Sequence, residues 1–188
     1  MKKGLSTAAK TAIGGMSVAL SVIILLPTAL EIFVYALPAM AGMLTMFCVI
    51  ELGKTWAFGV YFASSAIGLL LVPNKEAVVM YVAFFGYYPI IKAILESKLP
   101  RVPEYIIKFA VFNVSVLIAY VLLIKVFGMP FDEVMGIGDN ATWSKFAVPI
   151  MLALGNIVFI VYDLALTRIA TVYIRIWQKK FRKMFRFK

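Results

Sequence analysis

Residues 105–127 read YIIKFAVFNVSVLIAYVLLIKVF, an almost unbroken run of apolar side chains. A helix needs about 20 such residues to cross the hydrocarbon core of a bilayer, so this run predicts a transmembrane helix. Its apolar residues neither alternate with a period of two nor keep to one helical face, as they would in a half-buried element of a soluble protein. The run therefore favours a protein whose solvent is lipid.

The composition of the whole chain agrees with this interpretation. Of its 188 residues, 63% are hydrophobic and only 15% are charged, whereas roughly 25% are charged in soluble domains. No stretch rich in proline, glycine, serine or charge divides the chain. We therefore expect a single transmembrane domain, residues 1–188, with room for one bundle of helices.

Working outward from the first run, five further apolar runs have a comparable length. Turn residues separate them, among them Pro27, Gly53, Pro73 and Pro100. A longer loop follows Gly128. The sequence predicts an all-α polytopic membrane protein with six transmembrane helices, at about 9–29, 32–50, 55–72, 77–95, 105–127 and 146–174.

The distribution of lysine and arginine predicts the orientation, because basic loops resist translocation across a membrane. With the N-terminus inside, 16 of the 19 basic residues fall on the cytoplasmic side, and only Lys75, Lys125 and Lys145 fall outside. We therefore expect both termini in the cytoplasm and the protein in the cell inner (cytoplasmic) membrane. An alternative is a signal peptide cleaved near residues 39–41, which would leave five spans.

The absence of histidine and the presence of a single cysteine exclude several kinds of chemistry. The chain has no histidine, so His-based catalysis and His-ligated metal sites are excluded. Cys48 is the only cysteine and cannot form an internal disulfide. The net charge of +10 follows from the distribution of basic residues between the membrane sides, so it requires no nucleic acid partner. We expect no cofactor and no metal.

Polar positions within the spans carry expectations about packing. Lys92 and Glu96, one helical turn apart, are expected to pair or to extend to the cytoplasmic interface. Pro89, at the centre of the same span, is expected to loosen the helix locally. An ionised Asp163 at the bilayer centre would cost roughly 2.5–3.5 kcal/mol. It is therefore expected near the inner surface, paired with a cation such as Arg168, or in a transport or proton pathway.

The first span places small residues at Ala8, Ala12, Gly15 and Ala19, spaced by four, three and four positions. This spacing puts all four on one face of a helix. Small residues let a second helix approach closely, which is a main source of helix association in lipid. The face is expected either to pack inside the bundle or to dock another membrane subunit.

Two segments outside the spans have their own chemistry. Residues 176–188 place aromatic side chains at near-helical spacing among six basic residues. This pattern predicts a basic amphipathic cytoplasmic tail that lies along the membrane surface and binds anionic lipid. The loop 130–145, which contains Trp143 and three acidic residues, is a candidate cover for a solute pocket on the outer face.

The first three spans also carry motifs that resemble a known family. They are the small-residue face of the first span, the segment 36–42 (ALPAMAG) and the segment 54–59 (KTWAFG). With six helices and cytoplasmic termini, they resemble the substrate-binding S components of energy-coupling-factor (ECF) transporters. The chain has no Walker-type phosphate loop, which agrees with an energy source in another subunit.

The resemblance implies a membrane subunit that binds a vitamin-like solute from outside and performs no catalysis itself. Its partners would be an ECF-type transmembrane coupling subunit, on which the small-residue face docks, and two cytoplasmic ATPases. In that family the pocket lies among the outer loops and the outer halves of the later helices. The candidate substrate-binding residues in that region are Tyr81, Asn113, Tyr120, Trp143 and Asn156.

Two other functions stay open on the sequence. A non-transporting scaffold or morphogenesis-type membrane protein would use the small face and the basic tail to recruit proteins or lipids. A membrane enzyme acting on lipid head groups would need acidic or hydroxyl catalysts. The acidic residues do not cluster convincingly in the sequence, so we expect no enzyme.

Overall fold

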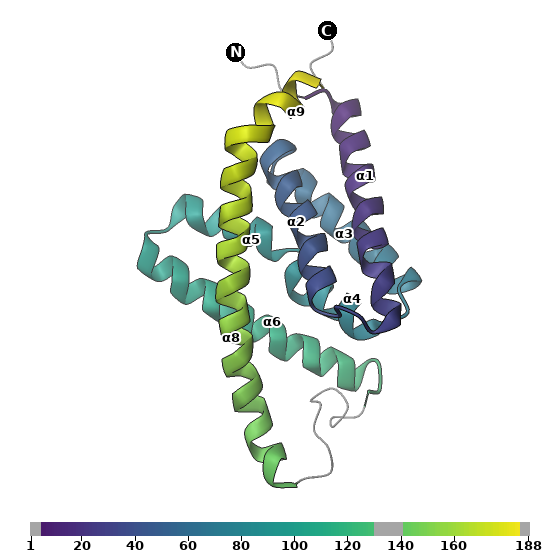
Figure 1. Cartoon of the computed structure of the whole chain (residues 1–188), viewed down its shortest axis with the longest axis vertical. Coiled ribbons are helices and arrows are strands. Elements are labelled where there is room, and N and C mark those ends of the chain that lie inside the picture. Colours follow the sequence, from purple (N-terminus) through teal and green to yellow (C-terminus); the bar gives the residue numbers. More distant parts are fainter. Residues whose placement is uncertain (1–4, 130–140, 185–188) are drawn as a thin grey trace.

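The computed structural model describes residues 5–129 and 141–184, and within the second range the side chains of 149–183. Every regular element in these ranges is helical (Figure 1), as the all-α prediction requires. η1 is a 3₁₀ turn, and η2 and η3 are π-helical turns. In chain order the elements are α1 (Thr7–Leu25), η1 (Leu26–Leu30), α2 (Ala36–Glu51), α3 (Lys54–Leu71), α4 (Lys75–Met80), η2 (Tyr81–Phe85), α5 (Tyr88–Lys98), α6 (Arg101–Lys125), α8 (Ala141–Val172), η3 (Tyr173–Trp177) and α9 (Gln178–Met184).

Five helical segments of the described chain are long and apolar enough to cross a membrane. The expected second span, residues 32–50, corresponds to the shorter apolar helix α2 of 16 residues. By length and composition, the protein is a multi-pass helical membrane protein. The five segments are Thr7–Leu30, Lys54–Leu71, Lys75–Lys98, Arg101–Lys125 and Pro149–Lys183.

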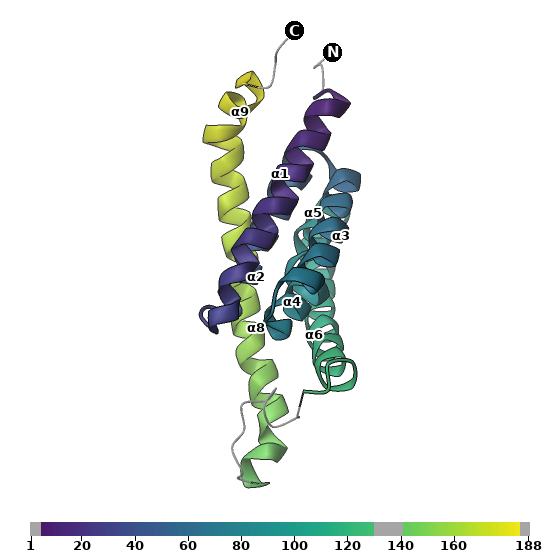
Figure 2. The ribbon, with the colours of Figure 1, turned by 90° about the vertical axis from the view of Figure 1, so that its right-hand side faces the viewer.

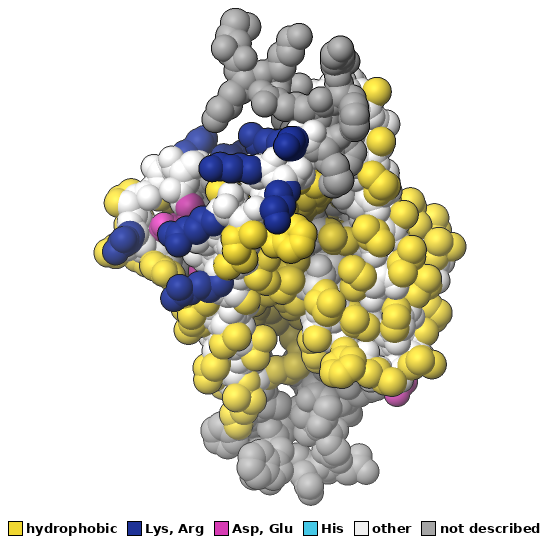
Figure 3. Space-filling model, turned by 45° about the horizontal axis from the view of Figure 1, so that its top comes forward, with side chains coloured by type: hydrophobic (Ala, Val, Ile, Leu, Met, Phe, Trp, Pro, Cys, Tyr) yellow, Lys and Arg dark blue, Asp and Glu magenta, His cyan; other side chains and the backbone are white. Residues whose placement is uncertain are grey.

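The first and last described helices meet at one end of the molecule. In Figure 1 the start of α1 and the short helix α9 are both at the top, the α1–α2 connection lies near mid-height, and the start of α8 is at the bottom. From the side, α8 and α9 form one edge of the molecule, and α3, α5 and α6 form the other (Figure 2). Lysine and arginine side chains gather toward the α9 end, and hydrophobic side chains cover much of the remaining visible face (Figure 3).

The predicted fourth span is interrupted near its centre. α4 passes into the π-helical turn η2, and α5 starts at Tyr88, directly before Pro89. Proline has no N–H to donate to the preceding turn, so the regular α-helical hydrogen bonds stop here. The expected local loosening of this span is therefore observed.

One backbone carbonyl released at the interruption has another partner. The Gly86 N–H bonds the carbonyl of Tyr81 at 2.7 Å, which leaves the carbonyl of Val82 without its α-helical donor. The hydroxyl of Tyr61 on α3 donates to this carbonyl at 2.7 Å. Because an unpaired carbonyl is costly where no water is present, this bond fixes α3 against the interruption.

Aromatic rings fill the space between η2, α5, α6 and α8. Phe112 and Phe159 stack with their ring centroids 4.9 Å apart, and Phe84 and Tyr88 lie 4.7 Å apart. Such pairs contribute about 0.5–1.5 kcal/mol beyond the area that they bury. These rings join α8 to the earlier helices. The buried members of this aromatic cluster are Phe84, Phe85, Tyr88, Phe112, Phe159 and Tyr162.

The C-terminal helix α9 returns to the end of α2. Arg182 pairs with the buried carboxylate of Glu51 at 3.0 Å, and the hydroxyl of Tyr173 donates to the same carboxylate at 3.2 Å. The ring of Phe47 meets the rings of Tyr173 and Phe181 edge-on. The tail is therefore attached to the bundle through α2, and its binding of anionic lipid stays a prediction.

Gly42 on α2 lies directly against the interrupted span. A Cβ atom at this position would come within 2.3 Å of the carbonyl oxygen of Phe85 and 2.6 Å of the hydroxyl of Tyr162. The first of these is a backbone atom, which cannot turn aside. At Gly59 on α3, by contrast, a Cβ atom would meet nothing within 4 Å.

We expect Gly42→Ala to lower the midpoint of thermal unfolding of the detergent-solubilised protein, because overpacking costs about 1–3 kcal/mol. Gly59→Ala makes the same chemical change in open space, and it should leave the midpoint unchanged or slightly raised. Equal midpoints for the two variants would contradict the close contact between α2 and the interrupted span.

Candidate functional site

A closed set of ion pairs joins α5, α6 and α8. The ammonium group of Lys92 lies 2.5 Å from Asp163 and 2.7 Å from Glu96. The ammonium group of Lys108 lies 2.9 Å from Glu96, 2.6 Å from Glu104 and 3.4 Å from Asp163. Because both lysines contact both Glu96 and Asp163, these charges form a ring of alternating sign, to which Glu104 is attached. We call the five residues the ion ring.

The ion ring is buried where an unpaired charge would be costly. The side chain of Lys108 is 1% exposed and that of Asp163 is 6% exposed, whereas that of Glu96 is 40% exposed and reaches the surface. Tyr88, from the aromatic cluster, donates a further hydrogen bond to Asp163 at 2.6 Å. Buried charges are tolerated when they are paired and hydrogen-bonded. The ring therefore ties three helices together at one level of the bundle.

The ion ring decides between the expectations about these charges. Lys92 and Glu96 pair, as their spacing on one helix indicates. Asp163 takes cation partners, but they are Lys92 and Lys108, and among the described contacts Arg168 is not one of them. The two lysines lie 71 and 55 positions away from Asp163 in the chain. No local spacing could have indicated them.

Replacing Lys108 by methionine would leave three carboxylates facing one ammonium group. We expect a loss of about 3–5 kcal/mol in the free energy of unfolding, measured by SDS titration of the protein in mixed micelles. Lys98→Met, the same change at an exposed lysine of α5, should have little effect.

The double variant Lys108→Met with Glu104→Gln tests whether the loss comes from unbalanced charge. Removing the charge of Glu104 leaves one ammonium group with two carboxylates, which gives the ring the same net charge as in the wild type. We therefore expect part of the lost stability to return. A double variant that is less stable than Lys108→Met would show that packing, not charge pairing, is the main role of Lys108.

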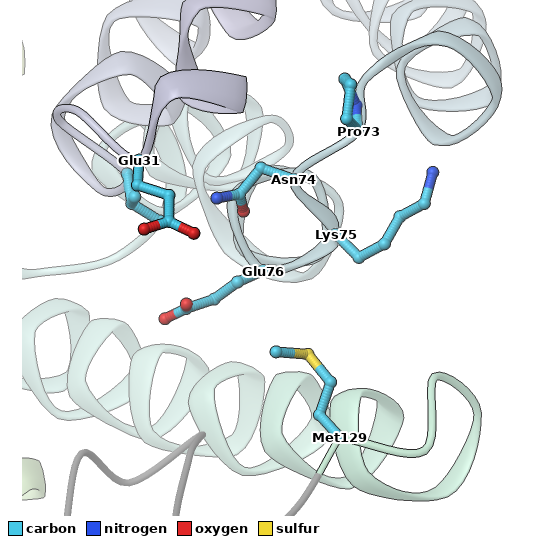
Figure 4. Close-up of a pocket in the computed structure, with 7 residues that line it drawn as sticks. Glu31, Pro73, Asn74, Lys75, Glu76 and Met129 are labelled. Atoms are coloured by element: carbon cyan, nitrogen blue, oxygen red, sulfur yellow. The ribbon is translucent and has the colours of Figure 1, made fainter.

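A second polar feature lies at the end of the bundle away from α9. It is an open pocket of about 440 Å³ between the α1–α2 connection, the α3–α4 connection and the end of α6 (Figure 4). Small-molecule sites commonly have volumes of about 300–1,000 Å³. The residues that line the pocket are Glu31, Val34, Pro73, Asn74, Lys75, Glu76 and Met129.

Local backbone geometry places the polar residues of the pocket. Glu31 ends the 3₁₀ turn η1 with a φ of 58°, in the left-handed region that most residues avoid. Asn74 caps α4, because its side chain accepts the N–H of Ala77 at 2.9 Å. This cap starts the helix directly before Lys75 and Glu76. The pocket therefore draws its two carboxylates from two separate segments, the end of η1 and the first turn of α4.

The electrostatics of the pocket are acidic. Figure 4 shows the carboxylates of Glu31 and Glu76 extending into one space, while the side chain of Lys75 points away from them. Tyr35 donates a hydrogen bond to Glu76 at 2.5 Å. Partial burial and this carboxylate raise the pKa of Tyr35 above its ordinary value, so the phenol keeps its proton.

Tyr81, Asn113, Tyr120 and Asn156, the substrate-binding candidates whose side chains are described, are not among the described residues that line this pocket. Tyr81 is fully buried, and its hydroxyl shares a hydrogen bond of 2.7 Å with Ser64 on α3. The side chain of Trp143 lies outside the described residues. The role of both in binding a solute stays a prediction.

The remaining three candidates lie between α6 and α8. Asn113 and Asn156 face each other and exchange two hydrogen bonds of 3.0 Å. Amide pairs of this kind hold helices together within a membrane. The hydroxyl of Tyr120 donates to the sulfur of Met151 at 2.8 Å. In the structure these residues connect the two helices, and no contact shows a further role.

The sequence interpretation did not select the residues that line the pocket. In the sequence, Pro73 marks a turn between two spans, and Lys75 is one of the basic residues on the predicted outer side. One signal could have found them: both connections fall on the same predicted side of the membrane and each contains a glutamate. Only the fold shows that the two connections are neighbours.

The small-residue face of α1 points away from the bundle. Ala8, Ala12, Gly15 and Ala19 are all exposed, and a Cβ atom added at Gly15 would meet nothing within 4 Å. Packing inside this bundle, the first of the two expected roles, is therefore not observed. The buried residues of α1 are Ile13, Gly14, Ser17, Ser21, Val22 and Leu25.

No protein-family model, curated protein or solved structure matches this chain. In the described part of the chain, no three histidine, cysteine or acidic side chains are placed to hold a metal ion. Any conclusion about function therefore has to come from the structure itself. The structure defines a multi-pass helical membrane protein with an acidic pocket at one end and a buried ion ring between its later helices.

Proposed function

We propose that this protein is the substrate-binding membrane subunit of an ECF-type importer, which binds a vitamin-like solute and performs no catalysis. The observation that carries the proposal is the open pocket of about 440 Å³ between the helix connections. A pocket of this size suits a small organic molecule. It lies between the α1–α2 and α3–α4 connections, and in this proposal a solute enters it from the outer side of the membrane.

In this proposal the chain crosses the cell inner membrane six times, with both termini in the cytoplasm. The start of α1 and the helix α9 lie at the same end of the molecule, which supports an even number of crossings (Figure 1). The basic side chains gathered toward that end support its cytoplasmic position (Figure 3). The 16-residue helix α2, which is second in chain order, then adds a crossing to the five longer segments and brings the total to six. The pocket opens to the outside.

The exposed small-residue face of α1 supports the partners of the proposal. In a membrane, apolar side chains gain little by exchanging contacts with lipid for contacts with another helix. Close backbone contact is therefore a main source of helix affinity. Ala12 and Gly15 leave a shallow strip for such contact. The proposed occupant is the ECF-type transmembrane coupling subunit, driven by two cytoplasmic ATPases. Anionic lipid is proposed to bind the basic helix α9.

A non-transporting scaffold is the second candidate function. The exposed face of α1 and the attached basic helix α9 favour it, because both can recruit a partner without any solute. The two functions differ in the partner that the face binds and in the use of the pocket. Affinity purification from the native membrane distinguishes them directly.

We expect purification of the tagged full-length protein to recover one larger membrane subunit and two ATPases. Gly15→Leu should reduce their recovery at least tenfold, because the leucine side chain fills the strip and prevents close approach. Gly59→Leu is the matched control, since it adds the same side chain in equally open space on α3.

Both variants should unfold at or above the wild-type temperature, so a lost complex would not reflect a lost fold. Unchanged recovery with Gly15→Leu would contradict the docking face. Recovery of structural membrane proteins without any ATPase would overturn the importer and favour the scaffold.

A further inference from the structure

We infer that the pocket between the α1–α2 and α3–α4 connections selects cationic solutes. This inference rests on the proposed function, since it names the class of solute that the same pocket would take. It depends on the carboxylates of Glu31 and Glu76, which face the open space of the pocket, and on Lys75, whose ammonium group bonds backbone carbonyls instead. It does not depend on the identity of the importer's other subunits.

Two carboxylates face the pocket, and no described cation neutralises them. Glu31 makes no ion pair among the described residues, and it lies exposed at the end of η1. Glu76 is bonded by the uncharged phenol of Tyr35 and likewise has no ion pair among the described residues. The charge on each carboxylate is therefore available to a solute.

Lys75 lines the same pocket, but its ammonium group is occupied. It donates to the carbonyl of Leu69, in the last turn of α3, and to that of Val72, the residue that follows the helix, both at 3.0 Å. A cation is stabilised at the C-terminal end of a helix, where carbonyls lack intrahelical partners. This position draws the positive charge of Lys75 away from Glu31 and Glu76, as Figure 4 shows.

The size and the openness of the space suit an organic cation. The volume of about 440 Å³ exceeds what a single hydrated metal ion requires. The described chain also offers only two carboxylates here, and no group of three metal-ligating side chains. The apolar side chains of Val34, Pro73 and Met129 also line the pocket and would contact the uncharged part of such a solute.

The charge preference can be measured without knowing the solute. The full-length protein is labelled with ¹³C at its methionine methyl groups and placed in nanodiscs. Two soluble nitroxides of similar size are then added in turn, one with a trimethylammonium group and one with a carboxylate. Met129 lines the pocket and reports the local concentration of each probe, and the buried Met46 is the internal reference.

We expect the cationic probe to relax the Met129 methyl group at least about fivefold faster than the anionic probe at low salt, because one carboxylate already gives this ratio and the pocket has two. A carboxylate about 8 Å away in water enriches a cation a little more than twofold and depletes an anion by the same factor. Salt at about 0.5 M should reduce this ratio strongly. Glu31→Gln and Glu76→Gln should each lower it.

Lys75→Gln is the control of opposite sign, because it removes a positive charge and should leave the ratio unchanged or higher. Equal relaxation by the two probes, or faster relaxation by the anion, would overturn the cation preference while leaving a pocket that solutes enter. If neither probe relaxes Met129 more than Met46, solutes do not enter the pocket. That result would overturn both this inference and the site of the proposed function.

Discussion

The ion ring is the interaction on which the arrangement of the later helices depends. Two lysines and three carboxylates cannot be left singly in a membrane, because each unpaired charge would lose its solvation without compensation. Their pairing requires α5, α6 and α8 to meet at Lys92, Lys108 and Asp163. Apart from the ring, α8 is fixed mainly by the aromatic cluster and the Asn113–Asn156 pair, and much of its surface is exposed to lipid. The ring, together with these contacts, therefore sets the position and the rotation of this long helix.

The remaining features divide between the two ends of the molecule. Beside the ring, the aromatic cluster and the interrupted span fill the interior, and Tyr61 and Gly42 hold α3 and α2 against the interruption. At one end, α9 is tied to α2 through Glu51. At the other end, the connections between the packed helices surround the pocket. The polar groups of the pocket come from segments whose backbone is set by a helix cap at Asn74 and a left-handed residue at Glu31.

The sequence predicted more of the fold than of the site, for a physical reason. Apolar runs report on one helix at a time, so the spans around residues 55–72, 77–95 and 105–127 could be placed from local information. The Lys92–Glu96 pair and the effect of Pro89 are equally local, and both are found. The two lysines that bind Asp163 come from other helices. The partners of Tyr81 and Asn113 also come from other helices, so no spacing within one helix indicates them.

By itself, the sequence determined that this is a helical membrane protein with basic residues biased toward one side, because hydropathy and charge act through the solvent and need no partner. Only the tertiary structure decided which face of α1 is free, which cations neutralise Asp163, and that Glu31 and Glu76 share a pocket. These facts depend on contacts between segments that are distant in the chain. Such contacts follow from how helices pack, and in lipid that packing rests on shape and polar pairing, which no single segment reveals.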